Sequence, residues 1–356
     1  MNPKVVVNLK KLESNVRFVV DKLKAHGLSI IAVTKVHSAD KEIVALFEKF
    51  SEIEYFGDSR IQNLIKYQDS KKKKILIRIP MHGEVEAVVK YADISFNSER
   101  STIRLLNEQA KHLNKIHQIL LMVDLGDLRE GFFDEADLMK AVCEIDDMDH
   151  IELIGLGTNL TCYGAVIPDE ENLGRLIAYA EAIKSKFNLN LPMISGGNSS
   201  SLYLLDDEKQ KLPSGITNLR IGETFYLGVE TAYGLKYPEM FDDAVTIHAE
   251  IVELKEKPSF PIGTRGVDAF GQMPTFEDKG NRIKGILALG RQDVAVDGLI
   301  PIDTKLEIVG ASSDHLIIDF TQSVRLYTVG DTVEFRLQYG AMLAAFTSEY
   351  VTKEYV

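Results

Sequence analysis

The run Ile30-Ile31-Ala32-Val33-Thr34-Lys35 is a continuous apolar stretch that ends in a single lysine. Such a run is typical of a strand buried on both faces, which occurs mainly in parallel sheets. In α/β barrels, catalytic residues gather at the C-terminal ends of the strands. A lysine at such an end can be partly desolvated, which lowers the pKa of its amine and allows it to form a Schiff base with a carbonyl. A surface lysine that merely ends a strand is the alternative, and the rest of the chain decides between the two.

Short apolar runs alternate with segments of helical period from the start of the chain to about residue 235. Nine runs are candidate strands: Val5–Val7, Ile30–Val33, Ile53–Phe56, Ile75–Ile79, Ile94–Phe96, Ile119–Val123, Ile151–Leu156, Met193-Ile194 and Leu219–Ile221. Repeated β–α units predict a parallel sheet, and this number of them predicts a closed (β/α)8 barrel of the TIM type, with room for up to two runs outside the sheet. A doubly wound open sheet is second choice, because no G-x-G-x-x-G follows the first strands.

The pattern of the sequence changes after about residue 240, where helical periodicity gives way to short β-rich segments. Short β-rich segments alternate with Gly, Pro and Asp turns: Ala244–Glu253, Ile283–Leu289, Lys305–Val309, His315–Phe320 and Thr332–Phe335. Segments of this kind predict a separate all-β domain. We therefore predict two domains, an α/β barrel over residues 1–240 and a C-terminal β domain over residues 241–356.

Composition narrows the class of protein. The formal net charge of −12 argues against nucleic acid and against an anionic membrane surface as partners. Only two cysteines are present, Cys143 and Cys162, which is too few for a disulfide framework and favours a reducing cytoplasm. The N-terminus lacks the apolar stretch of a signal peptide, and no run approaches the roughly 20 apolar residues that span a bilayer.

Polar residues follow the predicted strands, and in a barrel they would face one common mouth. In chain order they are Lys35, Asp58 and Arg60, Arg78, Asn97, Arg129, Thr158-Asn159, the loop Ser195-Gly196-Gly197-Asn198-Ser199-Ser200-Ser201, and Arg220-Ile221-Gly222-Glu223. A Gly/Ser-rich loop offers backbone N–H groups and hydroxyls to an anion, and barrel enzymes often hold phosphate after strands seven and eight. A phosphate loop and a strand-end lysine in one mouth together suggest pyridoxal 5′-phosphate.

At this point the sequence resembles the alanine racemase class of pyridoxal-phosphate enzymes, and within it the alanine/ornithine racemase branch. The similar segments are Ala32–Lys35, Val123–Gly131, Gly155–Leu160, Ser195–Ser200, Leu219–Glu223, Val309-Gly310, Ser313–Asp319 and Tyr339. The resemblance implies that Lys35 holds the cofactor covalently and acts as one of two bases. It further implies that Ser199, the backbone of Gly222 and Glu223, and the Tyr339 hydroxyl bind the phosphate.

Three more roles follow from the resemblance. Arg220 would donate to the pyridine nitrogen, and because a guanidinium keeps its proton, the ring would stay a weaker electron sink that favours reprotonation over transamination. Asn159 falls where the family often has a histidine near the ring. Arg129 falls where an arginine approaches the cofactor oxygen and the substrate carboxylate.

The match departs from alanine racemases at two positions. Their catalytic tyrosine, which crosses into the partner subunit, is replaced by Arg291, and arginine is a poor proton shuttle because its pKa exceeds about 12. His315, Cys162 and Tyr233 remain candidates for the second base. Ala39 stands where a tyrosine is expected four residues after the lysine. Both departures favour a roomier pocket for a diamino acid, whose distal ammonium could meet one of three acids, Asp127, Glu130 or Asp293.

The sequence therefore predicts a pyridoxal-phosphate-dependent amino-acid racemase that interconverts the L and D forms of ornithine, lysine or alanine. The resemblance implies a homodimer, and the composition favours the cytoplasm. One alternative is a non-catalytic pyridoxal-phosphate-binding protein of cofactor homeostasis. Another is a barrel-type aldolase or decarboxylase, and a third is a barrel enzyme in which Lys35 reacts with its substrate without a cofactor.

Overall fold

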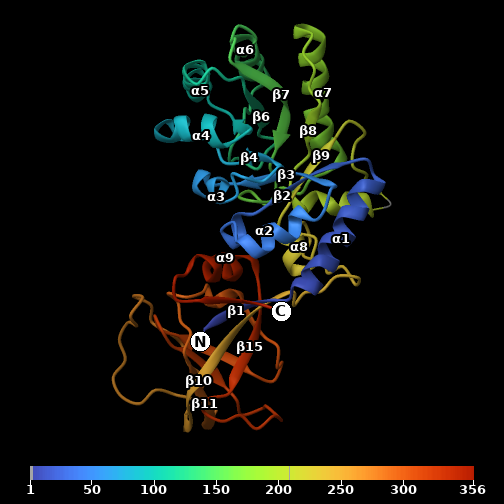
Figure 1. The fold of residues 1–356 in the computed structure, drawn as a ribbon. Helices are drawn as coiled ribbons and strands as arrows, with labels where there is room; N and C mark the ends of the chain where they lie inside the picture. Colours follow the sequence, from blue (N-terminus) through green and yellow to red (C-terminus); the bar gives the residue numbers. More distant parts are fainter. Residues whose placement is uncertain (1–2, 208) are drawn as a thin grey trace. The chain divides into compact units, whose positions relative to one another are not determined.

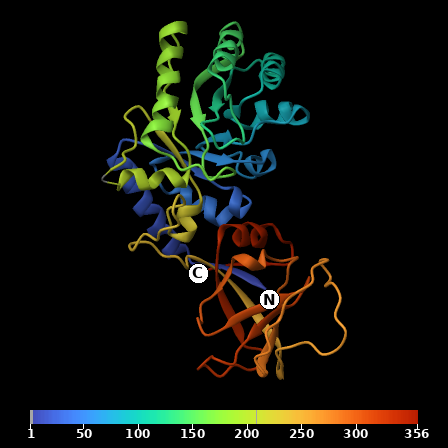
Figure 2. The same ribbon diagram turned by 180° about the vertical axis from the view of Figure 1, so that it is seen from behind.

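The computed structural model describes residues 3–207 and 209–356. The chain divides into two compact units: Lys11–Phe241, and Met1–Lys10 together with Asp242–Val356. In Figures 1 and 2 the first unit runs from blue to yellow and the second is mainly orange and red. The division predicted from the sequence, 1–240 and 241–356, stays a prediction about domains.

The first unit contains a closed barrel of eight parallel strands. Its strands are β2 (Ser29–Val33), β3 (Ile53–Asp58), β4 (Lys73–Leu76), β5 (Ile94–Asn97), β6 (His117–Val123), β7 (Ile151–Thr158), β8 (Met193–Ser195) and β9 (Asn218–Ile221). Each strand pairs with the next in the chain, and β9 closes the ring on β2, where Arg220 lies opposite Ile31. The predicted (β/α)8 barrel with a following β domain is confirmed.

Apolar side chains fill the barrel, and this packing explains why the short runs became strands. Eight of these side chains form one cluster: Ile31, Ile75, Ile94, Phe96, Leu120, Met122, Ile154 and Met193. Each such side chain contributes about 1.5–3 kcal/mol when it leaves water. The strands are buried on both faces because helices cover the outside, which is why their sequences read as continuous rather than alternating.

Helices follow the strands and surround the barrel (Figure 1). They are α1 (Leu9–Ala25), α2 (Lys41–Glu48), α3 (Ile61–Lys66), α4 (Val85–Tyr91), α5 (Arg100–His112), α6 (Glu135–Asp146), α7 (Glu170–Phe187) and α8 (Glu223–Leu227), with 3-10 turns η1 (Lys35–His37), η2 (His82–Glu84) and η3 (Ser199–Leu205). Aspartates begin α2, α6 and α7: the side chains of Asp40, Asp134 and Asp169 accept backbone N–H bonds from the first turn.

The second unit is an eight-stranded sheet with one α-helix among its described residues. Its elements are β1 (Lys4–Val7), β10 (Val245–Pro258), β11 (Asn281–Leu287), η4 (Val296–Gly298), β12 (Leu299–Pro301), β13 (Glu307–Ala311), β14 (Leu316–Asp319), β15 (Thr332–Leu337), α9 (Tyr339–Thr347) and β16 (Thr352–Tyr355). The run predicted as a first strand, β1, pairs with β10 and β16 instead of joining the barrel. The helix α9 was not predicted.

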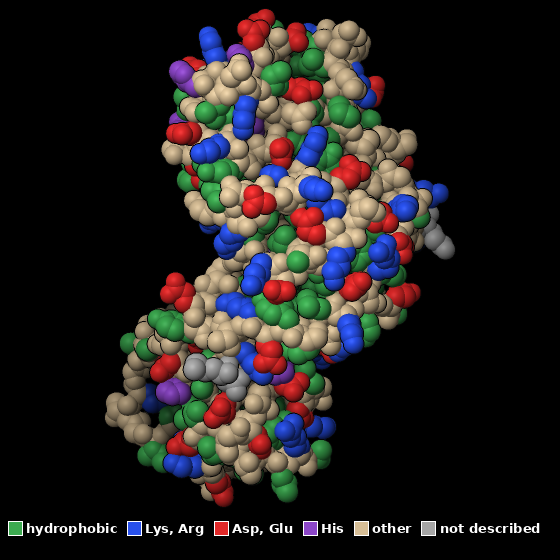
Figure 3. Space-filling view, viewed as in Figure 1, with side chains coloured by type: hydrophobic (Ala, Val, Ile, Leu, Met, Phe, Trp, Pro, Cys, Tyr) green, Lys and Arg blue, Asp and Glu red, His purple; other side chains and the backbone are tan. Residues whose placement is uncertain are grey.

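Charges of both signs are interspersed over the face of the barrel unit seen in Figure 3, without a basic patch on that face. This distribution agrees with the net charge of −12. Within residues 3–207 and 209–356, no helix is long and apolar enough to cross a membrane.

Candidate active site

The strand-end residues of the barrel meet at one end, because all eight strands run parallel. Lys35 lies two residues after β2 and begins η1, where it is partly buried. The preceding Thr34 donates from Oγ1 to Oδ2 of Asp58 at the end of β3, over 2.7 Å. Asp58 is fully buried and also accepts from the backbone N–H of Arg60 and from Asn63. The carboxylate of Asp58 therefore fixes the end of β2 from which Lys35 projects.

Burial lowers the pKa of the Lys35 amine below its usual value. Four charged or ionisable groups also act on it: Arg129 and Arg220 lower the pKa further, whereas Cys162 and Asp58 oppose the shift. These groups come from the loops after β6 and β7, from β9 and from β3, so several strand ends converge on the amine. A lowered pKa leaves more of the amine neutral at pH 7, which is the form that attacks a carbonyl.

Arg220 lies in β9 and is only 4% exposed. Its guanidinium donates to Ser195 Oγ (2.8 Å), to the carbonyl oxygen of Thr158 (2.5 Å) and to Asn159 Oδ1 (3.2 Å). Burial lowers the pKa of Arg220 to about 10, so the group stays charged at neutral pH. Arg220 thus holds the ends of β7, β8 and β9 together, and its positive charge acts on Lys35.

The two predicted phosphate segments lie side by side. The backbone N–H of Gly222 donates to Ser199 Oγ over 3.4 Å. A Cβ at Gly222 would meet the Val33 Cβ at 3.3 Å, so the close approach of β9 to β2 favours glycine here. Burial raises the pKa of the next residue, Glu223, to about 7, while the Lys35 charge opposes that rise. The side chain of Glu223 is therefore a second ionisable group next to Lys35.

The loops after β6 and β7 are joined by Asp127. Its carboxylate is buried and accepts from the backbone N–H groups of Tyr163 (2.9 Å) and Val166 (3.2 Å). The carboxylate of Asp127 is thus occupied in holding the loop after β7 and is poorly suited to bind the distal ammonium of a diamino acid. Arg129, on the same loop, donates from Nη2 to Oε1 of Glu130 over 2.6 Å, so Glu130 is engaged as well.

Several buried polar atoms at this end of the barrel have no hydrogen-bond partner among the described residues, and Thr158 Oγ1, Asn159 Nδ2 and Ser200 Oγ are three of them. An unsatisfied buried polar group costs about 1–3 kcal/mol, so a polar ligand that satisfies these atoms is expected. They lie next to Arg220 and next to Ser199, that is, at the predicted ring-nitrogen and phosphate positions. The residues present therefore fit pyridoxal 5′-phosphate.

Several predicted residues belong to the second unit. Tyr339 begins α9, and its contact with phosphate stays a prediction. Arg291 stacks on Phe270 with its guanidinium carbon 4.9 Å from the ring centroid, and Asp293 accepts from the backbone N–H of Gly290. His315 is about half exposed and lies 3.3 Å from Asp314.

Sequence reasoning missed the structural roles of two residues. Ser195 is the acceptor that orients Arg220, and Asp127 is the tether between two loops. Both lie in segments that the sequence singled out, but a hydrogen bond to a residue 25 or 36 positions away leaves no local signal. Strand adjacency in the barrel is what brings these partners together.

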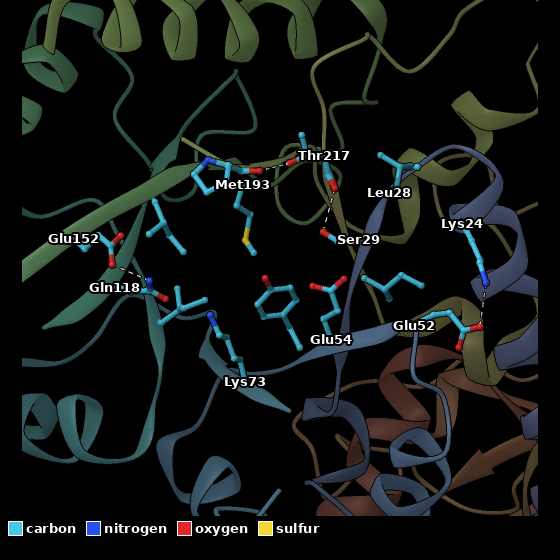
Figure 4. A pocket seen from close by; sticks show the side chains of 16 residues that line it. Lys24, Leu28, Ser29, Glu52, Glu54, Lys73, Gln118, Glu152, Met193 and Thr217 are labelled. Atoms are coloured by element: carbon cyan, nitrogen blue, oxygen red, sulfur yellow. Dashed lines mark hydrogen bonds and ion pairs between the residues drawn. The ribbon is translucent and has the colours of Figure 1, made fainter. Parts of the chain in front are cut away.

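A cavity of about 540 Å³ lies at the other end of the barrel, where the strands begin (Figure 4). Ser29, Lys73 and Met193, the first residues of three strands, help to line it. Its polar groups partly satisfy one another, as in the 2.8 Å bond from Gln118 to Glu152. None of the predicted site residues is among its lining residues in the described part of the chain. In barrels this end serves stability rather than chemistry.

Comparison with known proteins places the chain in one family. Residues 7–229 match the family described as "Alanine racemase, N-terminal domain". The chain is 54% identical over 354 residues to the ornithine racemase of Acetoanaerobium sticklandii, covering 99% of both chains. It is 37% identical over 355 residues to the lysine racemase of Thermotoga maritima, covering 99% of this chain and 98% of the relative.

Solved structures show the same fold. The alanine racemase of Bartonella henselae with covalently bound pyridoxal phosphate superposes with a TM-score of 0.74 at 17% identity, over the whole of both chains. A D-threonine aldolase from Filomicrobium marinum has a TM-score of 0.71 at 14% identity, covering 98% of this chain and 90% of that one. The fold is therefore common to several reactions, whereas the sequence match over nearly the full length is narrower: this chain belongs to the alanine racemase family.

Proposed function

We propose that this protein is a pyridoxal-phosphate-dependent amino-acid racemase and that its preferred substrate is ornithine. The observation that carries the proposal is the 54% identity with an ornithine racemase over 99% of both chains. The barrel mouth supports it, because a partly buried lysine, a buried arginine and a Ser/Gly cradle converge there. Lysine is the second substrate in rank, since the identity with the lysine racemase is 37%.

When bound, pyridoxal 5′-phosphate supplies a carbonyl carbon for an amine and an electron-withdrawing ring for the charge that remains when the α-proton leaves. Lys35 would bind it covalently, and Ser199, Gly222, Glu223 and Tyr339 would hold the phosphate. Arg220 would face the ring nitrogen, and Asn159 would lie beside the ring.

The chain's own residues then have defined tasks. The Lys35 amine would be one of the two groups that accept or return the α-proton of the substrate. The lowered pKa of that amine suits a base that must work near neutral pH. Arg129 would orient the substrate carboxylate at the rim of the mouth. The positive charge of Arg220 would disfavour a proton on the ring nitrogen of the cofactor and so would favour return of a proton to the α-carbon.

The proposal extends to a homodimer that works in the cytoplasm on a small-molecule amino acid. A non-catalytic protein of cofactor homeostasis would not need the second unit of the fold, so this unit counts against that alternative. An aldolase of this type would need a metal cluster, and residues 3–207 and 209–356 contain no group of three or more His, Cys, Asp or Glu suited to hold an ion. The structure thus adds no support to the aldolase.

Chiral chromatography of L-ornithine, L-lysine and L-alanine, incubated with purified protein and added pyridoxal 5′-phosphate, tests the function. We expect wild type to convert ornithine fastest, and Lys35→Ala to lose the reaction and the visible absorbance of the bound cofactor. Lys73→Ala is the matched control, because Lys73 is exposed at the opposite end of the barrel. A cofactor-loaded wild type that racemises none of the three amino acids would contradict the proposal.

A further inference from the structure

A racemase must remove a proton from one face of the α-carbon and return one to the other face, so it needs two acid–base groups. Lys35 accounts for one of them. We infer that the Cys162 thiol is the second catalytic acid–base group, acting on the face of the substrate opposite Lys35. The inference rests on the proposed racemase function and assigns a residue where the tyrosine of alanine racemases is replaced by Arg291.

Cys162 lies on the loop between β7 and α7, exposed to solvent at the barrel mouth. Asn198 donates from Nδ2 to the Cys162 sulfur over 3.6 Å, and the same amide group donates to Asn159 Oδ1 over 3.1 Å. Asn159 is 9% exposed, and its Nδ2 has no hydrogen-bond partner among the described residues. The Asn198 amide thus links the Cys162 thiol to Asn159, whose buried Nδ2 donor lacks an acceptor. This unsatisfied donor indicates that a polar ligand binds beside the thiol.

The thiol also shares the electrostatic environment of the reacting amine. Cys162 is, after burial, the largest influence on the pKa of Lys35, and it acts on Arg129 and Arg220 as well. Cys162 thus acts electrostatically on three cationic side chains of the mouth. Lys35 follows β2 and Cys162 follows β7, three strands away around the closed ring. The amine and the thiol therefore approach the centre of the mouth from different sides.

The other two candidates for the second base, Tyr233 and His315, have different surroundings from Cys162. Tyr233 is 57% exposed and packs edge-on against Tyr203, with ring centroids 5.2 Å apart. His315 belongs to the second unit and lies beside Asp314.

The loop that carries Cys162 is held in a defined conformation. Asp127 accepts from the N–H of Tyr163, the residue that follows the cysteine. Thr161, the residue before it, has a φ of +64°, and Ala165 has a φ of +54°. Left-handed backbone at a β-branched residue is strained and persists only where surrounding contacts enforce it. Asp127 is thus a positioning residue for the thiol.

The proton transfer balances with these two groups. In one direction the Cys162 thiolate takes the α-proton: the C–H bond breaks, the electron pair stays on the substrate, and an S–H bond forms. The Lys35 ammonium then gives a proton to the opposite face, forming the new C–H bond of the enantiomer. The thiol returns its proton to the amine through solvent, and no oxidant or reductant is consumed. The reverse direction exchanges the two roles.

Solvent-deuterium exchange separates the two groups. L- and D-ornithine are incubated in D₂O with cofactor-loaded wild type, Cys162→Ala and Cys143→Ala, and deuterium at the α-carbon is followed together with chirality. General acid–base groups contribute about 10²–10⁴-fold, so Cys162→Ala should racemise at least 100-fold more slowly. It should still exchange the α-proton of one enantiomer with retention, because Lys35 remains. Cys143, exposed on α6, is the matched control and should behave as wild type.

Alkylation of wild type and Cys143→Ala with iodoacetamide gives a readout that does not depend on the folding of Cys162→Ala. Loss of racemisation should follow the modified fraction of Cys162, measured by mass spectrometry, while the visible absorbance of the cofactor is kept. Three results would overturn the inference: racemisation by Cys162→Ala within threefold of wild type, full activity after complete alkylation of Cys162, or loss of exchange for both enantiomers in cofactor-loaded Cys162→Ala. Absence of racemisation in wild type would instead contradict the proposed function.

Discussion

At the scale of single residues, Arg220 shows how one buried charge can organise a site. Its guanidinium donates to a side-chain hydroxyl at the end of β8, and to a backbone carbonyl and a side-chain amide oxygen at the end of β7. It also lies over the ring of Phe96, with its central carbon 5.4 Å from the ring centroid. A buried cation is tolerated only when its donors find acceptors, and here three of them do.

Arg220→Lys tests this arrangement. The lysine ammonium lacks the planar fork of the guanidinium and cannot reach all three acceptors. We expect the free energy of unfolding to fall by about 2–3 kcal/mol, the value of losing buried hydrogen bonds to a charged group. Urea unfolding followed by far-ultraviolet circular dichroism measures the change. Arg104→Lys is the control, since Arg104 is exposed and pairs with Glu144, and the loss there should stay below about 0.5 kcal/mol. Equal losses in both variants would contradict the assigned role.

The sequence pointed to the mouth residues because strand ends can be read from apolar runs. Lys35, Ser199, Arg220 and Gly222 all lie where the predicted strand ends put them. The partners that orient them could not be read in the same way. Ser195 accepts from Arg220 only because β8 and β9 are neighbours in the closed ring, a relation that depends on the whole barrel.

At the scale of elements, the loops after β6 and β7 act as one unit. Asp127 joins them through two backbone N–H groups, and a Cβ at Gly164 would come within 2.8 Å of the Asp127 carbonyl oxygen. Left-handed residues occur in both loops, at Leu128 and Thr161. The strain is stored where the loops approach Lys35, which is typical of functional sites.

Asp127→Ala should release this pair of loops. Two backbone N–H groups lose their acceptor, so we expect faster amide hydrogen exchange in residues 161–166 and a loss of about 1–3 kcal/mol in stability. Exchange in α7 should stay as in wild type, because that helix is capped independently by Asp169. Hydrogen-exchange mass spectrometry reads both segments in one experiment. Asp149→Ala, at an exposed position, is the control. Unchanged exchange in residues 161–166 would show that Asp127 does not hold the loop.

Element boundaries were less predictable than element types. The run Ile75–Ile79 was expected as a strand, but β4 spans Lys73–Leu76 and begins inside a lysine run. The first apolar run became β1, which pairs antiparallel with β10, more than 230 residues later in the chain. An apolar triplet looks the same in either sheet, so only tertiary pairing decides where it goes.

At the scale of the whole molecule, the repetition of β–α units was sufficient to predict the barrel, because eight similar units close one ring. The second unit carries no such repetition. Its strands pair across long distances in the order β12-β15-β10-β11-β14-β13, and α9 interrupts them. Short β-rich segments separated by Gly, Pro and Asp turns predicted a β domain but could not predict its strand order.

The stability of the barrel unit should depend on pH through two buried histidines. Burial lowers the pKa of His37 to about 3 and that of His117 to about 4, against a usual value of 6.5. Both pKa values are lower in the folded than in the unfolded chain. The stability that the two neutral histidines contribute is therefore present above pH 6.5 and is lost as the pH falls toward 4 and 3. At pH 5 the unfolded chain has protonated each imidazole while the folded chain has not, which costs about 2 kcal/mol for each histidine.

His117→Gln separates one of these contributions. The imidazole Nε2 lies 2.8 Å from the Ser95 hydroxyl, and the glutamine amide can keep a hydrogen bond there without titrating. We expect the variant to lose about 2 kcal/mol less than wild type between pH 7 and pH 5, measured by urea unfolding at both pH values. His112→Gln, at an exposed position on α5, should reproduce the wild-type difference. If His117→Gln kept the full wild-type loss, the acid sensitivity of the barrel would have to arise from other groups, and the assignment of a neutral, buried His117 would be wrong.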